Sequence, residues 1–326
     1  MKKVLGMGNA LVDVLIRIHD DSLLQKFELP KGSMQLVDLD KSRFMQESMR
    51  NLNFEVASGG SAANTINGLA NLGAPCGYIG KISNDQNGEQ FKADMTSKGI
   101  EALLLIGNQP TGVATTLISS DSQRTFGTYL GSAVELSATD LKPEFFHGYD
   151  ILHIEGYLVQ NHELLEKAVI LAREAGLKIA IDMASYNIVA ANLDFLLSLV
   201  RKYVDIVFAN EEESKSFTGK EPLEALDEIA GMCEIAVVKI GAKGCLVKVA
   251  GKVIEVPAIA ANPVDTTGAG DLYASGFFYG MANNLSYEKC ARLGSLLAGN
   301  VIEVIGTKMD DLRWATIKKA VEKITG

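Results

Sequence analysis

Short segments rich in apolar and β-branched residues recur from residue 150 onward at roughly 30-residue intervals, the repeat length of β-α-β units. They lie at 151–154, 178–181, 206–208 and 235–240. Amphipathic stretches at 163–175 and 193–202 separate them, and the first ends before Gly176, as a helix would. Strands joined in this way run parallel through right-handed crossovers. The chain is therefore predicted to build an α/β core on a mainly parallel sheet, closed by helical stretches at 271–284, 287–304 and 312–324.

Two segments, residues 9–56 and 102–132, interrupt this rhythm. Within them, 111–119 and 124–130 have the composition of strands in a separate, partly exposed sheet. No internal repeat or low-complexity linker marks a second independently folding unit. We therefore expect a single domain, residues 1–326, that carries a small β-sheet lid built from two insertions at about 9–56 and 102–132.

The distribution of charged and apolar residues limits the classes of partner that this chain can bind. The chain has 31 Lys and Arg against 40 Asp and Glu, a formal charge of −9, and no basic stripe that would bind a nucleic acid. No segment approaches the ~18 apolar residues of a membrane span, and the apolar run 4–7 is too short for a signal peptide. We therefore expect a cytoplasmic protein that binds neither nucleic acid nor membrane. The cysteines form no CxxC pair and are expected to be reduced core residues: Cys76, Cys233, Cys245 and Cys290.

The stretch 262–271 carries the strongest chemical signal, because a glycine-rich loop there becomes a helix. Gly268, Ala269 and Gly270 let the backbone approach a ligand, and the unpaired amides of the first helical turn point outward with the positive end of the helix dipole behind them. This pattern predicts an anion hole. Asp271 within the turn is either a helix cap or a catalytic base.

A second glycine pair, Gly59 and Gly60, precedes an Ala-rich and Leu-rich helix. Paired glycines admit a ligand against bare backbone, and the Asn64 amide is placed to hydrogen-bond hydroxyl groups. The alternative is a tight turn that only starts the helix.

Together these stretches resemble a known family. Asp265-Thr-Thr-Gly-Ala-Gly-Asp271 resembles the C-terminal signature of the ribokinase family, also called the PfkB carbohydrate kinases, and Gly59-Gly60-x-x-x-Asn64 resembles its N-terminal motif. The resemblance implies a three-layer α/β/α fold with a lid. It also implies an ATP-dependent kinase in which Asp271 deprotonates the acceptor hydroxyl while Gly59, Gly60 and Asn64 hold the substrate.

Two acidic positions extend the resemblance. The stretch 6–13 looks like the family's first strand, followed by an Asp that holds two vicinal hydroxyls, here Asp13. Asn210-Glu-Glu-Glu213 is similar to the family's N-x-x-E motif, in which Glu213 would order Mg²⁺ and phosphate through water. A surface Asp and an acidic helix start are the structural alternatives.

The stretch 237–244 resembles the family's nucleotide loop, in which Gly241 and Gly244 would pass beneath ATP. Lys239 stands where many members carry Thr, and it either contacts phosphate as a point charge or merely ends a strand. Asn300 falls near the adenine site of the family pattern.

A monovalent cation such as K⁺ is also implied by the resemblance. Asp265 and Thr267, with the backbone around 301–306, match the place where family members commonly hold one beside the anion hole.

Other classes fit less well. Leu11 stands where the third glycine of a Rossmann G-x-G-x-x-G motif should be, and Lys220 is followed by Glu221 rather than by the Ser or Thr of a P-loop. A ligand-binding member of the family that has lost catalysis is a third alternative. It would be expected to lack the base or a glycine of the turn, and all are present.

The acceptor is left open between two classes. A nucleoside such as adenosine is favoured because 6–13 resembles adenosine kinases and because apolar lid residues could flank a purine: Leu11, Met34, Leu36 and Phe126. The alternative is a free sugar or sugar phosphate of the ribose or fructose type. Arg124 would then meet a substrate phosphate, and Glu155 is a further candidate sugar contact. The same apolar residues leave both a monomer and a lid-mediated homodimer open.

Overall fold

The computed structural model describes residues 1–121 and 123–326. In this part of the chain a nine-stranded sheet forms the body. Its strands, in spatial order, are β14 (Lys252–Val256), β13 (Cys245–Val249), β12 (Ile235–Lys239), β11 (Ile206–Asn210), β10 (Lys178–Asp182), β9 (Ile151–Glu155), β1 (Val4–Met7), β5 (Cys76–Ile82) and β6 (Glu101–Ile106). The run from β12 to β6 is parallel, and β13 and β14 add antiparallel strands at one edge. The mainly parallel sheet predicted from the sequence is confirmed.

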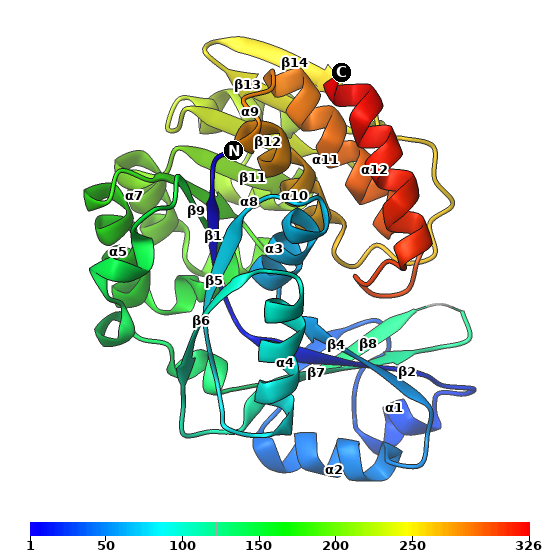
Figure 1. The fold of residues 1–326 in the computed structure, drawn as a ribbon. Coiled ribbons are helices and arrows are strands. Elements are labelled where there is room, and N and C mark those ends of the chain that lie inside the picture. Colours follow the sequence, from blue (N-terminus) through cyan, green and yellow to red (C-terminus); the bar gives the residue numbers. More distant parts are fainter. Residues whose placement is uncertain (122) are drawn as a thin grey trace.

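Helices cover both faces of this sheet, which confirms the three-layer arrangement (Figure 1). One face packs against α5 (His162–Glu174), α6 (Tyr186–Ala191), α7 (Leu193–Tyr203), α8 (Glu211–Thr218) and α9 (Pro222–Ala230). The other packs against α3 (Ser61–Asn71), α4 (Gln86–Ser97), α10 (Ala269–Ala282) and α11 (Tyr287–Val301), with α12 (Asp311–Thr325) outside α11. Short 3₁₀ turns lie at Ser132–Glu135, Ala138–Asp140, Pro143–Phe146, Gly156–Gln160 and Gly241–Lys243.

Alternation along the strands explains the two-sided burial. In β9, Ile151 belongs to the core on the α3 side, and its neighbour Leu152 belongs to the core on the α5 side. Both side chains are buried, at 1% and 0% exposure. Each such side chain stabilises the fold by about 1.5–3 kcal/mol relative to an exposed position. The body is therefore one continuous structure that holds the carboxyl ends of its parallel strands in fixed register.

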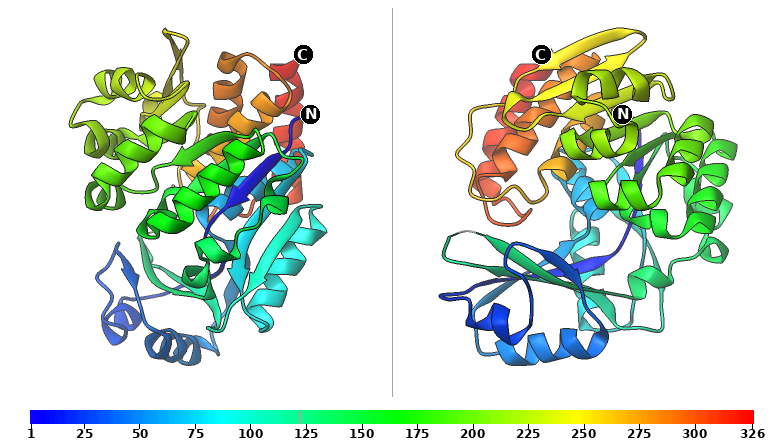
Figure 2. Two further views of the ribbon diagram at one scale, coloured as in Figure 1. Left: turned by 90° about the vertical axis from the view of Figure 1, so that its left-hand side faces the viewer. Right: turned by 180° about the vertical axis from the view of Figure 1, so that it is seen from behind.

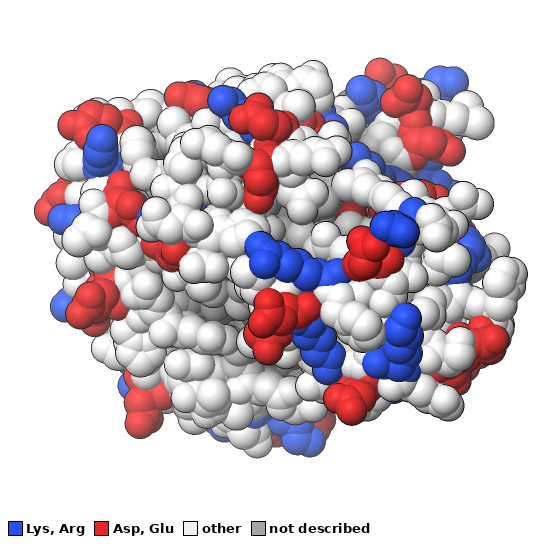
Figure 3. Space-filling model, turned by 90° about the horizontal axis from the view of Figure 1, so that it is seen from below, with Lys and Arg blue, Asp and Glu red and all other residues white. Residues whose placement is uncertain are grey.

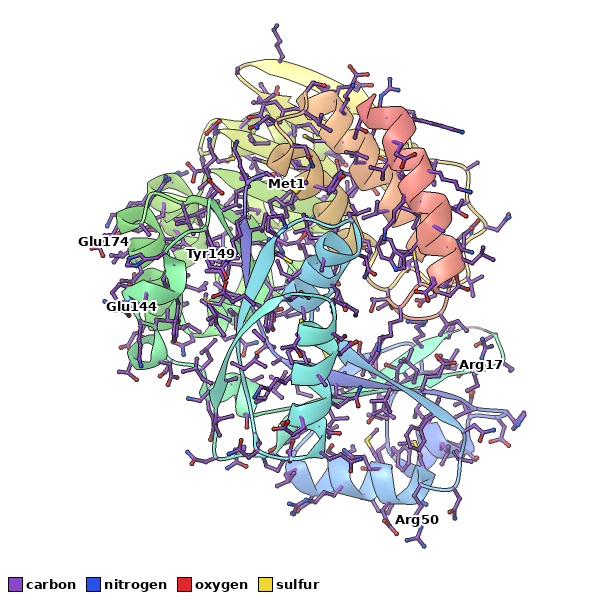
Figure 4. All side chains as sticks on the ribbon, in the orientation of Figure 1. Met1, Arg17, Arg50, Glu144, Tyr149 and Glu174 are labelled. Carbon is purple, nitrogen blue, oxygen red and sulfur yellow. The ribbon has the colours of Figure 1, made fainter. Side chains whose placement is uncertain are left out.

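The lid is a second, five-stranded sheet within the described residues, with the order β3 (Met34–Leu36), β8 (Arg124–Gly131), β7 (Thr111–Ile118), β2 (Leu11–Arg17) and β4 (Phe54–Gly59). Its outer face packs on α1 (Ser22–Lys26) and α2 (Leu39–Met49) through Ile16, Leu117, Phe27 and Met45. The lid lies at the end of the molecule opposite both termini (Figure 2). Arg17 and Arg50 mark it in Figure 4, whereas Met1 lies in the body.

The lid boundaries differ from those predicted. The stretch 101–106 pairs with β5 in the central sheet, so the second lid segment starts only at β7. At the other boundary, β4 continues to Gly59, because it pairs with β2 up to Leu11. Both differences arise because strand pairing is decided by distant partners rather than by local sequence.

Surface features follow from the same arrangement. Seen from the lid end, Lys and Arg stand among Asp and Glu (Figure 3). No helix in the described residues is long and apolar enough to cross a membrane. All four cysteines in the described chain are free thiols, and Cys76, Cys245 and Cys290 are buried.

The packing of α10 on α11 depends on glycine. A methyl group at Gly276 would lie 2.3 Å from the carbonyl oxygen of Leu293, and one at Gly280 would lie 2.7 Å from the sulfur of Cys290. The absence of a side chain at Gly276 and Gly280 lets the backbones of α10 and α11 approach closely. This close packing fixes the position of the first turn of α10.

We predict that Gly276→Ala lowers the free energy of unfolding by about 1–3 kcal/mol, the range for overpacking a core. This loss opposes the ~1 kcal/mol that alanine would add as a better helix former. Gly231→Ala is the control, because a methyl group at Gly231 would approach only its own helix. Urea unfolding of both variants measures the difference, and equal midpoints would contradict close packing at Gly276.

Candidate active site

A cavity of about 1220 Å³ lies where the lid faces the carboxyl ends of the central strands. Asp13 and Phe126 line it from the lid, Asn210 and Lys239 from strand ends, and Asp271 from the start of α10. In open α/β sheets, ligands bind at the carboxyl ends of strands. The volume exceeds the roughly 300–1,000 Å³ typical of one small-molecule site, so two ligands can fit side by side.

The loop before α10 turns sharply into the helix at Gly268. This residue caps the helix with φ +73°, a left-handed conformation that favours glycine. The amide of Ala269 donates to the carbonyl of Thr266 at 3.2 Å, whereas the amides of Gly268, Gly270 and Asp271 have no backbone partner within the described chain. The turn therefore offers three unpaired N–H groups to an anion, although Ala269, which the sequence predicts to be among them, is already paired.

Asp271 lies in the same turn, and two donors from α3 hold its carboxylate. Ser61 Oγ donates to Oδ1 at 2.7 Å, and Asn64 Nδ2 donates to Oδ2 at 2.9 Å. Burial raises the pKa of Asp271 to about 6, although these two hydrogen bonds lower it. A carboxylate poised near neutrality, fixed in direction and lining a cavity, can act as a general base.

Asp13 faces the cavity from strand β2 of the lid. Its pKa is raised to about 7, first by burial and then by the charge of Asp271. A methyl group at Gly59 would lie 2.3 Å from the Asp13 carboxylate, so the glycine makes room for it. Gly60 adopts φ +100°, and a methyl group there would lie 2.1 Å from the carbonyl oxygen of Asn9. Of the predicted substrate contacts, the structure thus brings Asp13, Gly60 and Asn64 to the cavity.

A charged group lines the opposite part of the cavity. Lys239 Nζ contacts Asp182 Oδ2 at 2.9 Å and lies beside Gly270, where an added methyl group would be 3.0 Å from it. Burial lowers the pKa of Lys239, but the charges of Asp182 and Glu213 outweigh it, and the pKa is raised. The ammonium group is therefore charged and stands next to the unpaired amides.

Glu213 and Asn210 form a capping box at the start of α8. Asn210 donates to Glu213 from its backbone amide at 2.7 Å and from Nδ2 at 2.7 Å, and Glu213 N–H donates back at 2.8 Å. Burial raises the pKa of Glu213 to about 7, against the charge of Lys239. Both residues line the cavity, so the capping role and the predicted ligand role coexist.

The nucleotide loop lies at the far end of the cavity, where Gly241 and Gly244 line it with Ile259 and Gly299. Gly244 adopts φ +105°, and a methyl group there would lie 2.0 Å from the carbonyl oxygen of Val256. The loop can follow this path only with glycine.

Four predicted ligand contacts do not line the cavity: Gly59, Arg124, Glu155 and Asn300. Glu155 is 1% exposed, and its oxygens accept from the backbone and side chain of Asn9 and from the amide of Ala62. Asn300 donates to the carbonyl of Leu296 and accepts from Arg313 through its own carbonyl. Glu155 therefore joins the segment after β1 to the start of α3 through hydrogen bonds, and the backbone of Asn300 is held by Arg313 of α12.

Arg124 reaches from the lid to form an ion pair with Asp265. The Asp265 carboxylate also accepts from the amide of Thr267 at 2.9 Å and from that of Gly306 at 2.7 Å. Two amide donors and one cationic side chain thus surround the carboxylate that the family pattern associates with a monovalent cation. The cation site implied by the resemblance at Asp265 and Thr267 stays a prediction.

Two carboxylates of the cavity could help to hold a divalent ion. Within residues 1–121 and 123–326, no group of three or more His, Cys, Asp or Glu side chains is arranged to hold a metal. Glu213 and Asp182 nevertheless line the cavity together, and Mg²⁺ commonly uses one or two carboxylates while keeping waters and substrate phosphates as its other ligands. The acidic pair suits a metal that arrives with its phosphates.

Sequence reasoning missed three residues of the site. Asp182 could have been found, since it ends β10 beside the strand ends that carry Asn210 and Lys239. Ser61 lies within the recognised glycine motif without being singled out. Thr307, whose hydroxyl contacts Asn64 at 3.0 Å, lies in a loop with no local signal of its own.

Comparisons with known proteins agree with this geometry. Residues 32–313 match the model of the pfkB family carbohydrate kinases. A probable sugar kinase from Rhizobium etli CFN 42 is 33% identical, with a TM-score of 0.88 over 98% of each chain. The adenosine kinase from Sinorhizobium meliloti is 34% identical, with a TM-score of 0.87 over 98% of this chain and 99% of that one. A 5-dehydro-2-deoxygluconokinase from Listeria monocytogenes is 27% identical over 294 residues, 85% of this chain and 90% of the relative. Because the family model spans most of the sequence, this chain is a kinase of the pfkB carbohydrate kinase family.

Proposed function

We propose that this kinase transfers the γ-phosphoryl group of ATP to a primary hydroxyl of a nucleoside such as adenosine. The observation that carries the proposal is the position of Asp271. Its carboxylate is held by Ser61 and Asn64 beside the unpaired amides of Gly268 and Gly270, in a cavity that also reaches the lid residue Phe126.

The proposed reaction is an in-line displacement. Asp271 accepts the proton of the acceptor hydroxyl as its oxygen forms a bond to the γ-phosphorus, and the bond from that phosphorus to the β-γ bridging oxygen breaks to release ADP. The amides of Gly268 and Gly270 donate to the phosphoryl oxygens, on which negative charge accumulates. Asp13 accepts hydrogen bonds from two adjacent hydroxyls of the acceptor and sets its orientation.

Lys239 completes the phosphate side. Its ammonium group forms an ion pair with Asp182 and lies next to Gly270. From this position it can contact the phosphates as a point charge. Mg²⁺ bound with the nucleotide would be held through water by Glu213 beside Asp182, and it would neutralise phosphate charge. Gly241 and Gly244 leave space for the nucleotide, with Ile259 and Gly299 as apolar contacts for its base.

The lid favours a nucleoside acceptor. Met34 on β3 pairs with Phe126 on β8, so their side chains emerge on the same face of the sheet. Phe126 lines the cavity, and Asp13 emerges from the same sheet. A purine stacked on Phe126 would gain about 1 kcal/mol beyond simple burial. The similarity to an adenosine kinase at 34% identity supports the same choice.

A sugar acceptor is the second candidate. The Rhizobium etli protein is described as a probable sugar kinase, and the Listeria relative as a 5-dehydro-2-deoxygluconokinase. A phosphorylated or acidic sugar would need a cation near Asp13. Arg124 is the lid residue of that charge, and it could serve only by leaving Asp265.

We predict that Asp271→Asn lowers kcat by roughly two to four orders of magnitude, the range for losing a general base. The amide keeps the size of the side chain, so the affinity for ATP should change little. Asp40→Asn, at an exposed position in α2, is the control. Steady-state kinetics with coupled ADP detection measures both variants. Turnover of Asp271→Asn near that of the control would remove Asp271 from its role.

The pH dependence of kcat/KM should report the same carboxylate, because kcat/KM follows the pKa values of the free enzyme. Asp271 must be ionised to accept a proton, and burial raises its pKa to about 6. Activity should therefore be full well above that pH and fall about tenfold per unit as the pH drops below it. Asp13, with its pKa raised to about 7, broadens the upper part of this limb. A pH profile of kcat/KM that stays flat down to about pH 5 would contradict the assignment of the base.

Binding measurements should identify the acceptor. Adenosine should raise the melting temperature, because a ligand that binds only the folded state stabilises it. Ribose, fructose and fructose phosphate should raise it less. Phe126→Ala should weaken adenosine binding by roughly three- to tenfold through lost stacking, with ATP binding unchanged as the internal control. A larger shift with a sugar, unaffected by Phe126→Ala, would favour the second candidate.

A further inference from the structure

Thr307 connects a distant loop to the proposed catalytic base. It lies between α11 and α12, and its hydroxyl donates to Asn64 Oδ1 at 3.0 Å across 243 residues of sequence. Asn64 Nδ2 in turn donates to Asp271 Oδ2 at 2.9 Å. A continuous chain of hydrogen bonds therefore runs from Thr307 through Asn64 to Asp271.

Only one orientation of the Asn64 amide satisfies both neighbours. An ionised Asp271 can only accept hydrogen bonds, so the NH₂ group of Asn64 must face it. The amide oxygen then faces Thr307, which must donate its hydroxyl proton. If the amide turned over, its oxygen would face the carboxylate, and one hydrogen bond would be replaced by repulsion.

The surroundings of Thr307 fix it in place. Its methyl carbon lies against Gly268, where an added methyl group would be 2.4 Å away. The preceding residue, Gly306, donates its amide to Asp265 at 2.7 Å. The following residue, Lys308, approaches Asp94 at 3.5 Å. The loop is therefore anchored on both sides of the hydroxyl.

We propose that Thr307 is a positioning residue for phosphoryl transfer, whose hydroxyl sets the orientation of the Asn64 amide and so holds the Asp271 carboxylate towards the acceptor. This inference rests on the proposed function, which assigns Asp271 as the base. Thr307 does not touch the reacting atoms in this arrangement. It acts through Asn64.

The charges around Asp271 set the direction of the expected effect. Burial raises the pKa of Asp271, and the hydrogen bonds from Ser61 and Asn64 lower it. The titratable groups that act on Asp271 from the surrounding elements are Asp13 of β2, Glu155 of β9, Tyr157 of the turn that follows β9, Asp182 of β10 and Lys239 of β12. Since these stay in place when Thr307 changes, weakening the Asn64 bond should raise the pKa of Asp271.

Thr307→Val tests the proposal, because valine keeps the shape and the methyl contact with Gly268 but cannot donate. We expect kcat to fall roughly two- to tenfold, the effect of losing one hydrogen bond between two neutral groups. The acid limb of the pH profile of kcat/KM should move up by about half to one pH unit. KM for ATP should stay within about twofold. Thr307→Ser, which retains the hydroxyl, should show the kcat of the wild type and the wild-type position of the acid limb of the pH profile.

A double-mutant cycle and a direct titration sharpen the test. In an Asn64→Ala background, Thr307→Val should have no further effect, because its influence passes through the amide. ¹³C NMR of Asp-labelled protein, with the Asp271 signal assigned by its absence in Asp271→Asn, should show the same upward pKa shift without any turnover.

Three outcomes would overturn the proposal. The first is a kcat of Thr307→Ser as low as that of Thr307→Val, and the second is a double mutant in which the fold-losses of kcat from Thr307→Val and Asn64→Ala multiply. The third is a pKa of Asp271 that does not change in Thr307→Val. The titration also separates this inference from the proposed function. Wild-type protein that binds ATP but phosphorylates no nucleoside or sugar would contradict the function alone, while the NMR result would still decide the role of Thr307.

Discussion

The first turn of α10 is held against the first turn of α3, and the cavity depends on this contact. Besides the bonds to the Asp271 carboxylate, Thr65 Oγ1 donates to the Asp271 carbonyl at 3.1 Å, and Ser275 Oγ donates to the Thr65 carbonyl at 2.7 Å. A methyl group at Gly68 would lie 2.4 Å from Ser275 Oγ. Because both helices pack on the central sheet, the proposed base and the unpaired amides are positioned by the core of the body rather than by a mobile loop. Such rigid support is what positional catalysis requires.

The cavity is acidic before any ligand enters, and this has electrostatic consequences. Burial raises the pKa values of Asp13 and Glu213 to about 7 and that of Asp271 to about 6. Carboxylates with raised pKa values favour the protonated form, so the folded state loses stability as the pH rises from their unfolded values, near 4, to these folded values. Lys239 and Arg124 offset part of this charge. A divalent ion bound with a nucleotide would offset more of the charge of these carboxylates, because it brings positive charge next to Glu213.

Much of the body could be predicted from sequence, because its strands repeat a local pattern. The four strands predicted between residues 151 and 240 appear as β9 to β12 with ends displaced by at most a residue or two. The motif glycines could also be interpreted, since their conformations are intrinsic to the local turn, as at Gly268. These features share one property: the neighbouring residues in the chain are enough to specify them.

The remainder depends on partners that are remote in sequence. Residues 101–106 look like a lid strand until β5 is known to lie beside them. Glu155 at the end of a strand looks like a ligand contact in the sequence. In the structure its carboxylate is buried and accepts hydrogen bonds from the amides of Asn9 and Ala62. Thr307 has no local signal because its significance comes from Asn64, 243 residues away. The sequence therefore indicated which residues to propose for the chemistry, whereas the residues that orient them could be identified only in the structure.

Lid and body contribute to different parts of the proposed reaction, since the lid faces the acceptor and the body faces the phosphates. The groups proposed to act on the phosphates, among them Gly268, Lys239 and Asp271, all belong to the body. The lid supplies Asp13 and Phe126 to the acceptor side of the cavity. A substitution on the inner face of the lid, such as at Phe126, can therefore change which acceptor is held while the helix contact that positions Asp271 stays intact. The probable sugar kinase and the adenosine kinase both match this chain over 98% of its length, lid included, so a difference in acceptor would have to come from individual side chains rather than from the fold. Under the proposed function, acceptor specificity therefore depends mainly on side chains of the lid, and phosphoryl transfer depends on the body.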